Sequence, residues 1–251
     1  MGWTVVVPVK DAARGKSRLA GHVHDVLRAR LVRAMALDTV AATAASPEVS
    51  LVLVVTPDDE VAAALTGLTG APVRRVAEPS AGVGDGLNGA IRAGLARAAA
   101  GGGTAAVTGE PDGRPGSGRA TADVGLGPAQ DEPGPAGVAV LLGDVPALRT
   151  ADLTAALRAA RAHPRAVVVD AEETGTTLLT ARAGVSLEPR FGAGSAAAHR
   201  GLGHVDLGLP PGSSLRRDVD VPTDLEAVAA LGVGPFTRRV LADLGVDTSP
   251  S

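Results

Sequence analysis

The feature that most constrains the fold is a series of short, continuous apolar runs rich in valine, each bounded by turn-forming residues. Runs without alternating polar residues are typical of strands buried on both faces of a parallel sheet. We expect such strands at residues 4–9, 49–55, 73–76, 138–142, 166–169 and 176–180. Helical stretches are expected between them, at residues 24–45, 58–68, 86–99 and 151–162. This alternation predicts a Rossmann-like α/β fold, with a mostly parallel sheet and helices on both faces.

Two further segments complete the expected organisation. Residues 215–220 are expected to form a strand that leads into a helix beginning near Pro222. Residues 101–137 are rich in Gly, Pro, Ser, Asp and Glu and have almost no apolar periodicity. Such a segment cannot bury enough surface to offset its ordering entropy. We therefore predict one domain spanning residues 1–251, with a disordered insertion at 101–137.

Composition excludes several classes of protein. The net charge of −3, with basic residues scattered or confined to one loop, disfavours a nucleic-acid partner. The absence of cysteine excludes disulfides and zinc–thiolate sites. No apolar run approaches the ~18 residues needed to cross a bilayer, so no membrane partner is expected. The chain is predicted to be a cytoplasmic protein, and a homodimer is a possible assembly.

A cluster of positive charge follows the first expected strand. Lys10 and Lys16 are the only lysines of a chain with 24 Lys and Arg, and with Arg14 and Arg18 they place four cations within nine residues. Ligands of open α/β sheets bind at the carboxyl ends of the strands. Lys10, Lys16 and Arg18 are therefore predicted to hold phosphate groups as catalytic residues. The alternatives are a solvated basic loop and a P-loop, and the P-loop fails because Lys10 occupies the position of its first glycine.

Carboxylates follow two later segments. Asp144 comes directly after an apolar strand, and Gly143 before it is expected to give a ligand close access to the backbone. Asp218 and Asp220 project to the same side of an extended segment. Carboxylates from two segments suit a magnesium ion that bridges a triphosphate. We predict that Asp144, Asp218 and Asp220 bind Mg²⁺; the alternative for Asp144 is a cap of the next helix.

A glycine-rich segment, residues 78–88, lies between these groups. Its glycines would let backbone N–H groups approach a base or ribose, and Asn88 could read a base edge. We assign nucleotide binding to Gly84 and Asn88. The alternative for Asn88 is an ordinary residue at the start of a helix.

Six short motifs occur in register along the chain: Val-Pro-Val-Lys-(x)5-Lys-Ser-Arg-Leu, Leu-Asn, Leu-Gly-Asp-Val-Pro-Ala-Leu, Thr-Gly-Thr, Pro-Arg-Phe-Gly-(x)2-Ser followed by His-Arg, and Asp-Val-Asp-x-Pro-x-Asp-Leu. This pattern resembles the guanylyltransferases of coenzyme F420 biosynthesis, most closely their phosphoenolpyruvate branch. The resemblance implies a single-domain nucleotidyltransferase that uses Mg²⁺. It also implies that Thr176, Gly192 and Ser195 contact the phosphorylated acid.

The implied reaction joins GTP to phosphoenolpyruvate and gives enolpyruvyl-diphospho-guanosine and pyrophosphate. The partners would be GTP and a small phosphorylated carboxylic acid, and 2-phospho-L-lactate and 3-phosphoglycerate would also satisfy this description. The residues alone leave open a molybdenum-cofactor guanylyltransferase and, outside the enzymes, a nucleotide-binding regulator. Arg190 is expected to pair with the substrate carboxylate or to lie in a surface loop. His199 and Arg200 could lie near the substrate phosphate, but for His199 the favoured expectation is the surface face of a helix.

Overall fold

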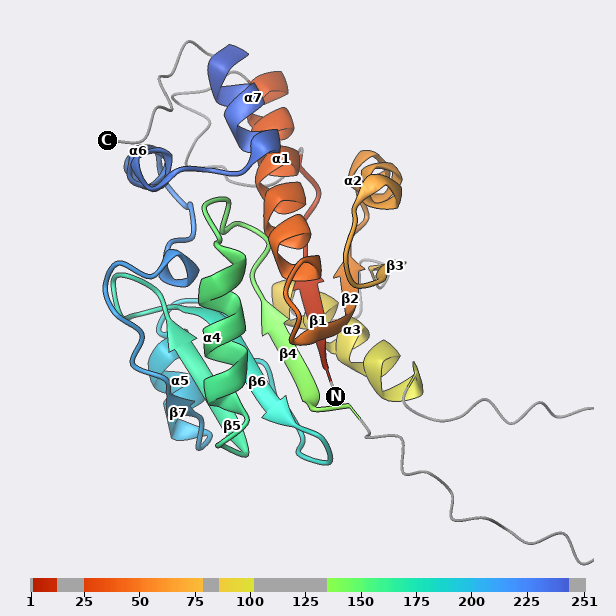
Figure 1. The fold of residues 1–251 in the computed structure, drawn as a ribbon, viewed down its shortest axis with the longest axis vertical. Coiled ribbons are helices and arrows are strands. Elements are labelled where there is room, and N and C mark those ends of the chain that lie inside the picture. Colours follow the sequence, from red (N-terminus) through yellow and green to blue (C-terminus); the bar gives the residue numbers. More distant parts are fainter. Residues whose placement is uncertain (1, 13–24, 79–85, 102–134, 244–251) are drawn as a thin grey trace, which may run out of the picture.

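The computed structural model describes residues 2–12, 25–78, 86–101 and 135–243, which form one α/β unit around a seven-stranded sheet (Figure 1). The strand order across the sheet is β3-β2-β1-β4-β6-β5-β7. The strands are β1 (Trp3–Pro8), β2 (Val49–Val55), β3 (Val73–Val76), β4 (Gly137–Leu141), β5 (Arg165–Val169), β6 (Thr176–Arg182) and β7 (Val205–Asp206).

Helices connect and cover the strands. The α-helices are α1 (Asp25–Ala44), α2 (Asp59–Ala64), α3 (Leu87–Gly101), α4 (Thr150–Ala160), α5 (Ser195–Gly201), α6 (Pro222–Leu231) and α7 (Pro235–Asp243). Two short 3₁₀ helices, η2 (Leu65–Gly67) and η3 (Ser214–Arg216), follow α2 and precede α6. None of the helices within the described ranges is both long enough and apolar enough to cross a membrane.

The sheet is mostly parallel, as the apolar runs predict, but β6 is not. Strands β1, β2, β3 and β4 pair in parallel, whereas β6 runs antiparallel to both β4 and β5. The expectation that residues 176–180 form a parallel strand is therefore wrong. A strand buried on both faces reads as a continuous apolar run in either direction, so the sequence pattern does not report the direction.

Side chains on opposite faces of the sheet build two separate parts of the core. On one face, Val5 and Val7 pack with apolar residues of α1 and α4. On the other face, Val6 packs with Ile91 of α3 and with Phe191. A third cluster, which includes Leu31 and Met35 of α1, packs α6 and α7 against the upper half of α1 (Figure 1).

Residues 215–220 do not form the expected strand. Ser213 caps η3 by accepting a hydrogen bond from the N–H of Leu215, and the Ser214 hydroxyl donates to Asp152 at 2.7 Å. These side-chain bonds satisfy the backbone of this segment locally and favour a turn over a strand. The sequence patterns also give no sign of α7 and β7. Residues 102–134 of the predicted insertion lie outside the described residues, so its disorder stays a prediction.

Helix α3 approaches the sheet closely at Gly94. A Cβ atom at this position would lie 2.3 Å from Cγ1 of Val6 and 2.9 Å from Cγ2 of Val55. Both neighbours are fully or almost fully buried. The α3–sheet contact therefore depends on the absence of a side chain at residue 94.

We predict that Gly94→Ala lowers the free energy of unfolding by about 1–3 kcal/mol, because the added methyl group overpacks the contact. Gly101→Ala is the matched control in the same helix, since its Cβ would meet only the flexible end of Arg97 at 3.4 Å. Urea denaturation of the two variants checks this. Equal stability of Gly94→Ala and wild type would contradict the close approach.

Candidate active site

A cleft of about 590 Å³ opens at the carboxyl edge of the parallel strands. Its lining comes from the ends of β1 and β4, from the start of β6, from the loop before α5 and from the segment before α6. Lys10 lies in this lining just after β1 and is exposed. The cleft is thus where ligands of an open α/β sheet bind, and Lys10 is at the predicted place.

Three carboxylates gather in this cleft. One oxygen atom from each of Asp144, Asp218 and Asp220 lies within 4.8 Å of the others. Asp144 and Asp218 are half-buried and Asp220 is exposed. The structure thus brings together the three residues predicted as metal ligands, and their hard oxygen atoms fit a divalent cation.

Backbone contacts hold the two acidic segments against each other. The N–H of Val219 donates to the carbonyl of Asp144 at 3.0 Å, which joins the segment between η3 and α6 to the end of β4. Asp224, in the first turn of α6, accepts hydrogen bonds from the N–H groups of Asp220 and Val221 at 2.7 Å. These bonds hold the backbones that carry the three carboxylates next to each other.

Helix α1 fixes the Asp144 turn from the opposite side. The buried hydroxyl of Thr39 accepts a hydrogen bond from the N–H of Val145 at 3.2 Å and donates to the carbonyl of Met35 at 2.9 Å. A Cβ at residue 143 would lie 2.9 Å from the carbonyl oxygen of Pro8, so the absence of a side chain makes room for the end of β1. Gly143 also lines the cleft, and its close access for a ligand stays a prediction.

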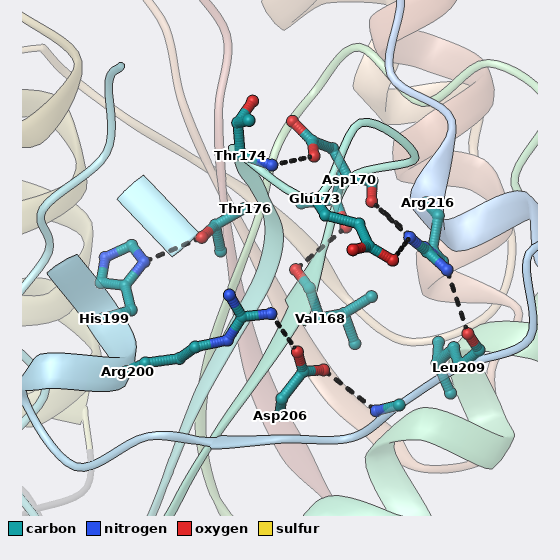
Figure 2. Close-up of polar contacts among 12 residues, drawn as sticks. Val168, Asp170, Glu173, Thr174, Thr176, His199, Arg200, Asp206, Leu209 and Arg216 are labelled. Atoms are coloured by element: carbon teal, nitrogen blue, oxygen red, sulfur yellow. Dashed lines mark hydrogen bonds and ion pairs between the residues drawn. The ribbon is translucent and has the colours of Figure 1, made fainter. Parts of the chain in front are cut away.

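A second acidic group shares Asp218 with the first. Oxygen atoms of Asp170, Glu172 and Asp218 also lie within 4.8 Å of one another. Both carboxylate oxygens of Asp170, however, accept backbone hydrogen bonds. One comes from Thr174 at 3.0 Å (Figure 2) and the other from Gly175 at 2.7 Å. These bonds shape the loop that precedes β6, so we assign Asp170 a role in the loop.

The antiparallel direction of β6 places Thr176 in the cleft. β6 begins at Thr176, and its direction puts this beginning beside the end of β4. The N–H of Leu142 donates to the carbonyl of Thr177 at 3.0 Å, so Thr176 and Asp144 lie on the same rim. In a parallel strand, Thr176 would lie at the opposite edge of the sheet.

The loop from Arg190 to Ser195 forms another wall of the cleft and contains two predicted substrate contacts, Gly192 and Ser195. Gly192 has φ +132° and Gly194 has φ +71°, conformations that side chains rarely adopt. The N–H groups of Ser195 and Ala196 are bonded to carbonyls of Gly192 and Thr174. Within the described part of the chain, the N–H groups of residues 192–194 make no hydrogen bond, and these three residues line the cleft.

Asn88 holds this loop to helix α3. Its side-chain N–H group donates to the carbonyl of Phe191, and its side-chain oxygen accepts from the N–H of Phe191, both at 2.9 Å. The structure therefore gives the Asn88 amide a contact inside the protein that sequence reasoning missed. Its predicted role in reading a base stays a prediction. Gly84, Lys16 and Arg18 lie outside the described residues.

His199 of α5 is buried behind the cleft, so the expectation of a surface position is wrong. Its Nδ1 lies 2.9 Å from the Thr176 hydroxyl (Figure 2). Its Nε2 accepts a hydrogen bond from the N–H of Arg190 at 3.0 Å. Burial, and to a smaller extent the neighbouring His204, lower the pKa of His199 from 6.5 to about 4. His199 is thus neutral at pH 7. Arg190 pairs with Glu188 at 2.6 Å, and both side chains are exposed.

A cleft at the carboxyl edge of the sheet, with an acidic triad beside a lysine and facing a glycine-rich wall, defines a nucleotidyltransferase-like α/β protein. A fold comparison agrees with this class. A putative nucleotide-diphospho-sugar transferase from Desulfovibrio desulfuricans has a similar fold, with a TM-score of 0.63, 16% identity and coverage of 98% of this chain and 96% of that one.

The chain belongs to the family of MobA-like NTP transferase domains, whose model matches residues 13–204. Among its relatives, the phosphoenolpyruvate guanylyltransferase of Sanguibacter keddieii is 47% identical, over 95% of this chain and 84% of the relative. The phosphoenolpyruvate guanylyltransferase of Streptomyces scabiei is 43% identical, over 97% and 98%. The resemblance predicted from the six motifs is confirmed.

The lowered pKa of His199 predicts how stability depends on pH. In the unfolded chain, His199 takes up a proton below pH 6.5, whereas in the folded protein it does so only near pH 4. The contribution of His199 to the free energy of unfolding is therefore fully present above pH 6.5 and is lost as the pH falls toward 4. His204, whose pKa is also lowered by burial, acts in the same direction.

Between pH 7 and 4.5, the wild type should therefore lose roughly 2–3 kcal/mol more unfolding free energy than His199→Asn, which cannot take up this proton. Urea denaturation of both proteins across this range measures the difference. Parallel pH profiles would show that His199 is not held neutral by burial.

Proposed function

We propose that this protein transfers the guanylyl group of GTP to the phosphate of phosphoenolpyruvate, with release of pyrophosphate. The observation that carries the proposal is that two groups of candidate binding residues lie in one cleft. The acidic triad and Lys10 lie on one side, and Thr176 with the 190–195 loop lies on the other. The names and the high identity of the relatives support the choice of substrates.

The acidic half suits the triphosphate. Asp144, Asp218 and Asp220 would hold Mg²⁺, which supplies charge neutralisation between two phosphate-bearing substrates that repel each other. Lys10 stands beside this triad and would pair with a phosphate oxygen of GTP as a compact point charge. Lys16, Arg18 and Gly84 remain proposals as phosphate-binding and nucleotide-binding residues, and so does the contact of Asn88 with a base.

The opposite half suits a small acid phosphate. Thr176 offers a hydroxyl group, and residues 192–194 offer backbone N–H groups. These neutral donors can satisfy the oxygens of a carboxylate or phosphate without adding another cation. We propose that Thr176, Gly192 and Ser195 bind the phosphorylated acid here, within reach of the triphosphate.

The reaction proposed is an in-line displacement. A phosphate oxygen of the acid attacks the α-phosphorus of GTP and forms the new P–O bond, while the bond from the α-phosphorus to the α–β bridging oxygen breaks. Pyrophosphate leaves with that electron pair. A phosphate monoester is already a nucleophile at pH 7, so the residues act by positioning and charge neutralisation rather than as a general base.

The same site chemistry accommodates 2-phospho-L-lactate and 3-phosphoglycerate, which differ from phosphoenolpyruvate by small groups worth only ~1–3 kcal/mol in a pocket. The relatives' names favour phosphoenolpyruvate among these. We place the reaction in coenzyme F420 biosynthesis and in the cytoplasm, in line with the motif resemblance. A homodimer stays a prediction.

Pyrophosphate release, measured with GTP, Mg²⁺ and each of the three acids in turn, tests this function. We expect the highest kcat/KM with phosphoenolpyruvate, and no release when the acid or Mg²⁺ is omitted. Replacing GTP by CTP or ATP measures the preference for guanine. No turnover with any of the three acids would overturn the proposal.

Loss of a metal-binding carboxylate should abolish turnover without unfolding the protein. We predict that Asp144→Asn and Asp220→Asn each lower kcat/KM by at least ~100-fold, since charge stabilisation of several kcal/mol is lost. Asp59→Asn is the control, because that carboxylate is exposed and pairs with Arg75 at the surface. Steady-state kinetics and Mg²⁺ titration calorimetry measure the effect. An Asn variant with more than a tenth of wild-type activity would remove that residue from the metal site.

A further inference from the structure

We propose that His199 is a positioning residue that forces the hydroxyl proton of Thr176 into the cleft and holds the loop that begins at Arg190. The inference rests on the proposed function, because it identifies what orients the donors for the phosphorylated acid. His199 itself does not line the cleft; it acts from behind it through two hydrogen bonds.

The hydrogen-bond partners fix the tautomer of His199. The N–H of Arg190 can only donate, so Nε2 of His199 must accept and carries no proton. A neutral imidazole then has its proton on Nδ1. This Nδ1–H points to the Thr176 hydroxyl oxygen, 2.9 Å away, and donates to it.

The consequence for Thr176 is a defined direction of its own proton. The Thr176 oxygen accepts a hydrogen bond from His199, so the O–H group of Thr176 must donate to a different acceptor. Among the described residues, the Thr176 hydroxyl has no hydrogen-bond partner besides His199, and Thr176 lines the cleft. The O–H is therefore available to an anionic oxygen of a bound acid. With the opposite tautomer, Thr176 would donate to His199 and present lone pairs to that anion.

The second hydrogen bond of His199 acts on the wall of the cleft. Arg190 precedes Phe191, which is clamped on its other side by Asn88, and the N–H groups of residues 192–194 follow. The Phe191 ring also packs edge-on against the His199 ring, with centroids 5.0 Å apart. The neutral imidazole of His199 thus orients the hydroxyl group of Thr176. It also holds the start of the loop that carries the N–H groups of residues 192–194.

The environment keeps this imidazole uncharged. The titratable group that faces the ring is His204, whose ring centroid lies 5.6 Å from that of His199, and whose Nδ1 lies 3.0 Å from the His199 carbonyl oxygen. The neighbouring Arg200 points away and pairs with Asp206 (Figure 2). Arg190 pairs with Glu188. No described carboxylate bonds the His199 ring, so none stabilises a protonated form that would lose the Arg190 contact.

Two substitutions separate the two hydrogen bonds. His199→Asn can place an amide N–H near the position of Nδ1 and keep the donor to Thr176. His199→Gln can place an amide oxygen near the position of Nε2 and keep the acceptor for Arg190, but it loses the donor to Thr176.

We expect His199→Gln to raise the KM for phosphoenolpyruvate by at least about 10-fold, the effect of a lost hydrogen bond to a charged group. The KM for GTP should stay within a factor of two.

A double-mutant cycle with Thr176→Val tests whether His199 acts through Thr176. Thr176→Val should raise the KM for phosphoenolpyruvate at least as much as His199→Gln does. Adding His199→Gln to Thr176→Val should raise it no further. Additive effects, or equal increases in the KM for GTP and for the acid, would overturn the proposal and leave His199 a purely structural residue.

A measurement without turnover reports the tautomer directly. Long-range ¹H–¹⁵N NMR spectra of protein with ¹⁵N-labelled histidine should show His199 Nδ1 protonated and Nε2 unprotonated at pH 7. A protonated Nε2 would overturn the inference. The two failures are distinguishable: a wild type without turnover refutes the proposed function, whereas an active wild type with a protonated Nε2 refutes only the role of His199.

Discussion

The site depends on the pairing of β4 with an antiparallel β6. A parallel sheet brings only the carboxyl ends of its strands to the binding edge. Reversing β6 brings the beginning of that strand, Thr176, to the same edge as Asp144, and the bond between Leu142 and Thr177 fixes the two ends side by side. Asp144 and Thr176 therefore meet across a single strand pair. In the proposed function, this pairing brings the metal site and the binding site of the acid together without a second domain.

Buried polar contacts hold the loops at this edge. Arg216 is almost fully buried and donates to the carbonyl oxygens of Asp170, at 2.8 and 3.2 Å, and of Leu209, at 3.2 Å (Figure 2). It lies two residues before Asp218, so it links the segment of the proposed metal ligands to the loop that leads into Thr176. Removing the Arg216 guanidinium would leave the carbonyl oxygens of Asp170 and Leu209 without these hydrogen bonds. Its loss would therefore lower the free energy of unfolding. The loop after Asp170 and the segment before α6 are thus held together by a buried side chain.

Much of the fold could be predicted from the sequence because strands buried on both faces leave continuous apolar runs bounded by turn-forming residues. The strands at residues 49–55 and 73–76 have the predicted bounds, and the carboxylates at residues 144, 218 and 220 meet as expected. The direction of β6 left no such signal. The positions of Asn88 and His199 were missed for a related reason: both contact the loop at residues 190–191, far away along the chain, and only the folded structure brings them together.

The central claim is that a cation at the acidic triad and the phosphate of the acid occupy one cleft across the β4–β6 pair. The direct test is the paramagnetic relaxation of the phosphorus-31 nucleus of phosphoenolpyruvate by Mn²⁺ bound to the protein with an unreactive α,β-methylene analogue of GTP. The account predicts strong relaxation in the wild type, which disappears in both Asp144→Asn and Thr176→Val. Relaxation that is absent from the wild type, or unchanged in Thr176→Val, would contradict the account.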